Sequence, residues 1–289
     1  MIETSPKKLF IAFQEYLVRQ SMSPATIKNY MADLNIFTQH LAPQAYNGAS
    51  LLTYSAADIR AYRDKMNAKG LATSTINRRL QALRKFGQFV IESRLRTHNP
   101  ALEVACLQTG KSSPPRILSD NEADDLLETV LVKATASKAS RDYAIILTLL
   151  SSGIRLRELV DLRLEDVELG LDEGYLMIGS SAQDGGRVIP FGAATTAALK
   201  AYLRVRPNIP NQDHLFLNRE GRHISPRTVQ RMVTRYAQAA GLEDISTQTL
   251  RTTFAHAMFK GTGDLKVVAK LMGHRSTATT ARYFDNLDS

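Results

Sequence analysis

The sequence has almost no cysteine and no long apolar run, and each absence excludes a class of protein. Its single cysteine, Cys106, excludes an internal disulfide and any metal site built from several cysteines, and it agrees with a reducing compartment. No segment approaches the roughly 18 to 20 apolar residues that a membrane span needs, and the opening MIETSPKKLF lacks the apolar centre of a secretory signal. We therefore expect a soluble, cytoplasmic protein with no membrane partner, whose 289 residues suffice for two domains.

Acidic residues are fewer than basic ones, 28 against 37, and the net charge of +9 favours a polyanionic partner. The charge is unevenly distributed. Residues 1–108 hold 14 Lys and Arg against 7 Asp and Glu, residues 116–185 hold 7 against 14, and residues 186–289 hold 15 against 7. Two basic regions thus flank an acidic one, a separation of charge that a protein with an evenly charged surface does not need. Charged blocks along the sequence need not form charged patches on the folded surface.

The first third of the chain is predicted to be helical. In SMSPATIKNYMADLNIF, Ser23 is expected to cap a helix that begins at Pro24, and apolar residues recur there at helical spacing. A second pattern of this kind, STINRRLQALRKFGQFVIESRL, predicts a helix with basic residues outside its apolar face.

A change of composition divides the chain. Residues 107–116, LQTGKSSPPR, combine Gly, Ser, Pro and positive charge without apolar periodicity, which is typical of a linker between domains 1–106 and 117–289. In the second domain, GYLMIGSSAQDGGRVIPF has two β-like runs around a Gly-containing turn and predicts an antiparallel hairpin. The expected fold class is mainly α: a helical N-terminal domain, then an α-rich domain with a small antiparallel β-sheet.

Four residues of the second domain suit phosphoryl transfer: Arg155, Arg251, His274 and Tyr283. The planar fork of arginine neutralises nonbridging phosphate oxygens, and a positioned tyrosine can attack phosphorus as a covalent nucleophile. Each residue alone also has a structural interpretation. Arg155 could be a surface charge, His274 a hydrogen-bonding group at a helix end, and Tyr283 part of an apolar face.

The order and spacing of these four residues resemble the tyrosine recombinase family, also called the phage integrase family, and most closely its Xer-like members. SPATIKNYMADLNIF and STINRRLQALRKF resemble the family's helical, SAM-like core-binding domain. SSGIRLRELVDLRLEDV and TLRTTFAHAMFKGTGDLKVVAKLMGH resemble the two blocks that carry the catalytic arginines. The likeness covers nearly the whole chain.

The resemblance implies a specific reaction. Tyr283 would attack a DNA phosphodiester, leaving a 3′-phosphotyrosyl link and a free 5′-hydroxyl, with no cofactor, ATP or metal. Arg155 and Arg251 would stabilise the charge around phosphorus, and His274 would hydrogen-bond the same phosphate. A tetramer of identical or related subunits would exchange strands through a Holliday junction at specific sites, in integration, excision or resolution.

Two departures from the family's pattern concern proton transfer. Gln248 stands where a histidine usually opens the second-arginine block, and glutamine can hydrogen-bond but cannot take a proton at neutral pH. The family's hairpin lysine, the general acid for the leaving 5′-oxygen, has no counterpart, because no lysine lies between Lys138 and Lys200. Arg187 is the one cation near that position and is too weak an acid to replace it. The residues around the expected position are Ser180, Ser181 and Gln183.

These departures leave alternatives open. The protein could be a natural variant that uses Gln248 with another acid or water, an altered or slow enzyme, or a degraded relative that binds DNA without cleaving it. A type IB topoisomerase shares the tyrosine chemistry but relaxes DNA without choosing a site. DNA binding does not depend on the missing groups. The residues expected to contact DNA are Lys28, Arg78, Arg79, Arg84, Lys85, Arg227 and Arg231.

Overall fold

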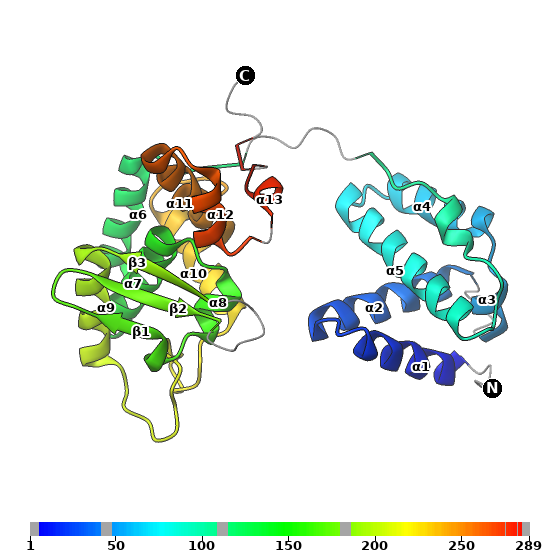
Figure 1. Ribbon diagram of the computed structural model, residues 1–289, viewed down its shortest axis with the longest axis horizontal. Coiled ribbons are helices and arrows are strands. Elements are labelled where there is room, and N and C mark those ends of the chain that lie inside the picture. Colours follow the sequence, from blue (N-terminus) through cyan, green and yellow to red (C-terminus); the bar gives the residue numbers. More distant parts are fainter. Residues whose placement is uncertain are drawn as a thin grey trace. The chain divides into compact units, whose positions relative to one another are not determined.

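The computed structural model of the protein describes residues 6–41, 48–108, 115–179, 186–274, 276–281 and 283–284. The chain forms two compact units, Met1–Ser112 and Ser113–Ser289 (Figure 1). Most of the expected linker, residues 109–114, lies outside the described residues. No helix in the described part of the chain is long and apolar enough to cross a membrane.

The N-terminal unit consists of helices around its own apolar core. Their bounds are α1 Pro6–Arg19, α2 Pro24–Leu41, α3 Gly48–Thr53, α4 Ala56–Ala68, α5 Thr73–Glu92 and the 3-10 helix η1 Pro100–Glu103. The expected start of α2 is confirmed, because the N–H of Thr26 donates to Oγ of Ser23 at 3.2 Å. Phe13 and Phe86 are fully buried and meet edge to face with ring centroids 5.2 Å apart, so α1 and α5 share one core.

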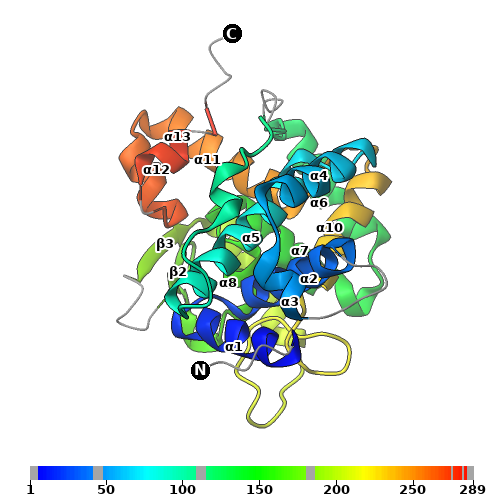
Figure 2. The same ribbon diagram turned by 90° about the vertical axis from the view of Figure 1, so that its right-hand side faces the viewer.

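The C-terminal unit is larger and combines helices with one small sheet. Its helices are α6 Asp120–Lys133, α7 Ala136–Ser152, α8 Leu156–Asp161, η2 Leu164–Asp166, α9 Ala193–Val205, α10 Pro226–Ala239, α11 Thr247–Thr262, α12 Leu265–Met272 and α13 Thr277–Ala281. Its strands are β1 Val167–Leu169, β2 Gly174–Ile178 and β3 Arg187–Phe191. The buried helix α7 packs against α6, α9 and α11, and Figure 2 shows α11, α12 and α13 grouped together.

The sheet contains the expected hairpin and one strand more. Strand β2 pairs antiparallel with β3, with Ile178 opposite Arg187, which confirms the predicted hairpin. Strand β1 pairs antiparallel with β2 on its other edge and was not expected, because three residues are too few to show an alternating pattern. Residues 180–185 of the hairpin turn lie outside the described residues, and they include Ser180, Ser181 and Gln183 around the expected lysine position.

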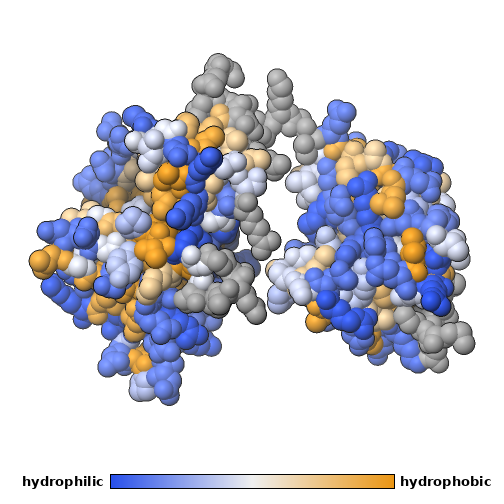
Figure 3. Space-filling view, viewed as in Figure 1, coloured by the Kyte–Doolittle hydropathy of each residue, from blue (hydrophilic) through white to orange (hydrophobic). Residues whose placement is uncertain are grey.

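Local signals determine where the helices of this unit begin and end. Ser119 and Glu122, three residues apart, form a capping box at the start of α6. Gly153 ends α7 and Gly273 ends α12, both in the left-handed conformation with φ of 58° and 64°. Figure 3 shows hydrophilic side chains over most of the visible face of each unit, with hydrophobic side chains in smaller areas between them.

Candidate active site

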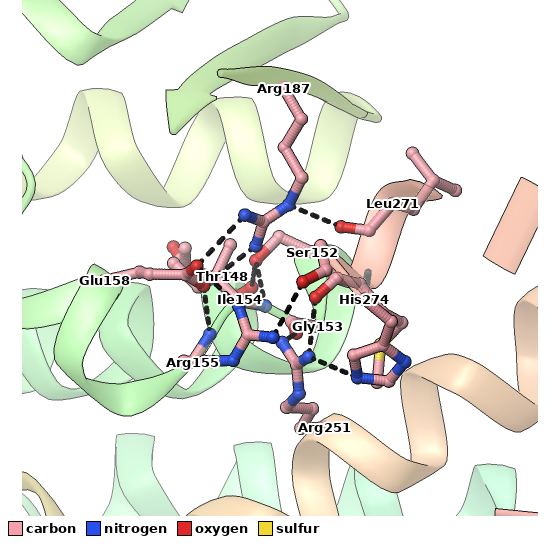
Figure 4. Close-up of polar contacts among 12 residues, drawn as sticks. Thr148, Ser152, Gly153, Ile154, Arg155, Glu158, Arg187, Arg251, Leu271 and His274 are labelled. Atoms are coloured by element: carbon pink, nitrogen blue, oxygen red, sulfur yellow. Dashed lines mark hydrogen bonds and ion pairs between the residues drawn. The ribbon is translucent and has the colours of Figure 1, made fainter. Parts of the chain in front are cut away.

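Three arginines converge on the C-terminal end of α12. The carbonyl oxygens of Leu271, Met272 and Gly273 each accept a hydrogen bond from a different arginine. The donors are Nε of Arg187 at 2.7 Å, Nη2 of Arg251 at 2.6 Å and Nη2 of Arg155 at 2.8 Å. The last carbonyls of a helix lack partners within the helix and carry partial negative charge, so this helix end stabilises the cluster of cations (Figure 4).

Arg155 occupies the turn between α7 and α8. Gly153 ends α7 in a left-handed conformation that directs the chain into the turn. A Cβ on residue 153 would overlap the ring of Phe254. The backbone N–H of Arg155 donates to the carboxylate of Glu158 at 2.6 Å, and its Nη1 donates to the same carboxylate at 3.0 Å. The Arg155 side chain is nevertheless 45% exposed, so it can meet a ligand from solvent.

Glu158 joins Arg155 to a second arginine. Nη1 and Nη2 of Arg187 donate to the two carboxylate oxygens of Glu158 at 3.0 and 2.8 Å. Burial raises the pKa of Glu158, but hydrogen bonds from Arg187 and from the Arg155 backbone outweigh it and leave the pKa below its ordinary value. Glu158 is therefore an ionised bridge that holds both guanidinium groups in place. Glu158 was not among the residues predicted from the sequence, although its spacing of three from Arg155 fits a helix start.

Arg251 is the buried arginine of the site. It lies on α11, is 3% exposed, and donates from Nη1 to the carbonyl oxygen of Gly153. Burial lowers its pKa, and the neighbouring Tyr283 opposes that shift. The capped start of α11 at Ser246, where the side chain accepts from the N–H of Thr249, sets the rotation that turns Arg251 inward.

His274 is neutral in this arrangement. Its Nε2 lies 3.1 Å from Nη2 of Arg251, which can only donate, so Nε2 is the acceptor and the ring proton is on Nδ1. Nδ1 then donates to Oγ1 of the buried Thr280 at 2.8 Å. Burial, aided by Arg251 and Arg155, lowers the pKa of His274 to about 4. The sequence analysis missed Thr280, which determines this tautomer.

Tyr283 lies beside His274 and Gln248. Its ring is stacked on the His274 ring with centroids 5.7 Å apart, and Nε2 of Gln248 donates to its hydroxyl oxygen at 3.0 Å. His256, also on α11, donates from Nε2 to the carbonyl oxygen of Tyr283 at 2.9 Å and fixes the backbone there. The fold thus brings together all five residues expected in the catalytic site, with Gln248 as a hydrogen-bond donor to the phenol.

The basic residues expected to contact DNA divide into two groups. Lys28, Arg227 and Arg231 are exposed on their helices. Arg78 pairs with the buried Asp33 while staying 41% exposed.

Arg79, Arg84 and Lys85 form the second group of expected DNA contacts and are less exposed than the first. All three are half-buried. Arg84 donates to the carbonyl oxygens of Ala101 and Val104 at 3.2 and 2.8 Å, and Lys85 lies over the ring of Tyr16. Segments η1 and α1 pack against this side of α5, which the periodicity of one helix cannot show.

Among the described residues, no group of three or more His, Cys, Asp or Glu side chains is placed to hold a metal ion. The cations of the site instead suit a phosphate group, because arginine donors match nonbridging phosphate oxygens.

Comparison with known proteins agrees with this geometry. Residues 116–289 match the model of the phage integrase family, and residues 10–94 match its N-terminal SAM-like domain. Tyrosine recombinase XerC of Pelotomaculum thermopropionicum is 33% identical over 285 residues, which cover 94% of this chain and 91% of the relative.

Two solved structures share the fold. XerH site-specific recombinase bound to its difH substrate has a TM-score of 0.77 at 19% identity and covers 99% of this chain and 96% of its own. A lambda integrase tetramer bound to a Holliday junction has a TM-score of 0.74 at 16% identity, covering 96% of this chain and 77% of its own. The mainly α fold with a SAM-like first domain is confirmed, and the chain belongs to the phage integrase family, as a Xer-like tyrosine recombinase.

Proposed function

We propose that this enzyme breaks and rejoins DNA at specific sites with Tyr283 as its nucleophile. The observation that carries the proposal is the convergence of the Tyr283 phenol with Arg155, Arg251 and His274 beside one helix end. Attack of the phenolic oxygen on phosphorus forms a 3′-phosphotyrosyl link and releases a 5′-hydroxyl. The reaction conserves the energy of the phosphodiester bond, so rejoining needs no external energy source.

The two arginines have different parts in this proposal. Arg251 is buried and held by two backbone carbonyls, which makes it a preorganised donor to the phosphate. Arg155 is more exposed and meets the phosphate from the solvent side. Losing one such donor costs about 3 to 4 kcal/mol in the transition state, so either arginine-to-alanine change should slow cleavage by 100-fold or more.

His274 and Gln248 orient the reacting groups. When a phosphate enters, its negative charge favours a proton on His274, so Nε2 changes from acceptor to donor. Gln248 holds the phenol by donating to its oxygen, and the same hydrogen bond stabilises the phenolate as the proton leaves. Gln248 does not titrate, so the phenolic proton passes to water in this proposal.

A covalent adduct on DNA tests the nucleophile. Bound sequences are first selected from genomic DNA, and a nicked suicide substrate carrying the selected site then traps the phosphotyrosyl link. The unaltered protein should yield an adduct, and Tyr283→Phe should yield none. Tyr175→Phe, on β2, is the matched control and should keep the adduct. If the unaltered protein binds its site but never forms an adduct, the chain is a DNA-binding relative without catalysis. Relaxation of DNA lacking the site would instead favour a type IB topoisomerase.

Both units contribute to DNA binding in this proposal, through basic side chains on their surfaces. Arg231 lines a cavity of about 660 Å³ with Lys138, Arg219 and Arg235, where several phosphate contacts could form. Arg231→Ala should weaken DNA binding about equally for all sequences. It should also reduce the slope of the logarithm of the binding constant against the logarithm of the salt concentration by about 1. Lys133→Ala, on the exposed end of α6, is the control, and an equal loss for both would argue against a specific role of Arg231.

The assembly follows from the same reaction. Exchange between two duplexes needs four cleavage events, which a tetramer of this chain, or of this chain with a related recombinase, would supply. A lambda integrase structure shows such a tetramer on a Holliday junction. We place the reaction in the cytoplasm, where the DNA substrate and the reducing conditions that suit a lone cysteine are found.

A further inference from the structure

A cavity of about 810 Å³ opens beside the proposed phosphate site. Arg155, His274 and Gly273 form one side of it, and Gly179 and Gly186, which flank the hairpin turn, form another. The cavity therefore extends from the reacting phosphate toward the part of the fold where the family's lysine is expected and this sequence has none. An acid for the leaving 5′-oxygen would have to reach this space.

Most cations that line the cavity are already paired. Arg155 and Arg187 share the carboxylate of Glu158, and Arg157 lies 3.2 Å from the carboxylate of Asp161. A guanidinium group also does not give up its proton in proteins, so none of these three residues can act as an acid. His274 donates from Nδ1 to Thr280, and in the proposed function its Nε2 donates to the phosphate, so both ring protons are engaged.

Among the described residues that line the cavity, Lys270 is the remaining cation. It lies near the end of α12, and its side chain is exposed and has no hydrogen bond or ion pair with any residue that the structure describes. Its backbone is fixed, because its carbonyl accepts from the N–H of Gly273 at 3.1 Å and the next carbonyl, of Leu271, accepts from Arg187. Lys270 thus has a flexible four-carbon stem and an ammonium group on a rigid base at the cavity wall.

We propose that Lys270 is the general acid that protonates the leaving 5′-oxygen, in place of the absent hairpin lysine. This inference rests on the proposed attack by Tyr283. As the bond from the phenolic oxygen to phosphorus forms, the bond from phosphorus to the 5′-oxygen breaks and its electron pair stays on that oxygen. The Lys270 ammonium gives this oxygen a proton and becomes an amine, while the phenolic proton passes to water. In rejoining, the amine takes the proton back as the 5′-oxygen attacks phosphorus and Tyr283 leaves.

A sulfur-substituted substrate separates this role from simple DNA contact. Replacing the bridging 5′-oxygen by sulfur gives a thiolate leaving group, which needs no acid, because thiols are far more acidic than alcohols. Lys270→Ala should cleave the oxygen substrate at least about 100-fold more slowly than the unaltered protein and the sulfur substrate at nearly the same rate. Lys270→Arg keeps the charge without a transferable proton and should behave like Lys270→Ala. Lys266→Ala, one turn earlier on α12 and outside the cavity, should affect neither substrate.

Several outcomes overturn the proposal. Equal slowing of both substrates by Lys270→Ala would make the residue a DNA contact, and unchanged cleavage of both would remove it from the reaction. Full activity of Lys270→Arg on the oxygen substrate would show that only the charge matters. If the unaltered protein forms no adduct with either substrate, the proposed function fails together with this inference. If it forms adducts with both, but the sulfur substrate does not restore cleavage by Lys270→Ala, only the role of Lys270 is overturned.

Discussion

The bridge formed by Glu158 predicts a loss of both stability and activity when its charge is removed. In the variant Glu158→Gln, one carboxylate oxygen becomes an NH₂ group, which cannot accept from the surrounding guanidinium and backbone N–H donors. Each carboxylate oxygen accepts two hydrogen bonds, from Arg155 and from Arg187, so at least two of the four contacts are lost. The new NH₂ group also faces donors that have no acceptor left.

The size of the effect follows from those contacts. A hydrogen bond to a charged group contributes about 1.5 to 3 kcal/mol, but the 18% exposure of Glu158 and the 45% exposure of Arg155 let water replace part of it. We expect a loss of about 2 to 3 kcal/mol in the free energy of unfolding. For a domain of this size, that loss lowers the unfolding midpoint by roughly 4 to 12 °C.

Calorimetry of the full chain tests the bridge, with the transition of the C-terminal unit followed in each variant. Asp161→Asn is the control, because the pair of Asp161 with Arg157 is exposed on both sides and should contribute less than about 1 kcal/mol. Cleavage by Glu158→Gln should also slow, since Arg155 and Arg187 lose their common anchor. Equal midpoints for the two variants would refute the assignment of Glu158 as a structural bridge.

Three further outcomes are expected. Gly153→Ala should lower the free energy of unfolding by roughly 1 to 3 kcal/mol in urea titration, because φ is 58° and a Cβ would overlap Phe254; an unchanged midpoint would contradict that conformation. The pKa of His274 is about 4 in the folded chain and near 6.5 in the unfolded chain, so the unfolded chain binds more protons between these pH values. The contribution of His274 to the free energy of unfolding is fully present above about pH 6.5 and is lost as the pH falls toward 4. In urea titrations at successive pH values, His274→Asn should lose less free energy of unfolding over that range than the unaltered protein. Gln248→His introduces a titratable group beside the phenol, so its adduct rate should rise with pH through roughly 6 to 7, whereas a profile identical to the unaltered protein would show that position 248 only orients Tyr283.

Features that depend on neighbours in sequence were predictable. The cap at Ser23 acts over three residues, so its hydrogen bond could be predicted from the sequence alone. The hairpin was predicted from two short apolar runs around a Gly-containing turn. The four residues of the proposed phosphate site were selected by their order and spacing, which resemble those of a known family and can be read from the sequence alone.

Contacts between distant segments were not predictable. Arg187 was expected near the hairpin, but packing of α12 against β3 brings it to the carbonyl of Leu271, and the fold also places Glu158 of α8 beside it. Arg84 was expected to contact DNA, and the fold places the carbonyl oxygens of Ala101 and Val104 beside it.

By itself, the sequence determined several helices, the hairpin, the family and the candidate catalytic residues, because these depend on local patterns and on spacing along one chain. Tertiary structure decided which partners those residues have: the end of α12 as the common acceptor of three arginines, the Nδ1 proton of His274, and the lone ammonium of Lys270 in the cavity. The physical reason is that protonation and ion pairing depend on burial and on the distance between groups, and both arise only when separate helices pack together.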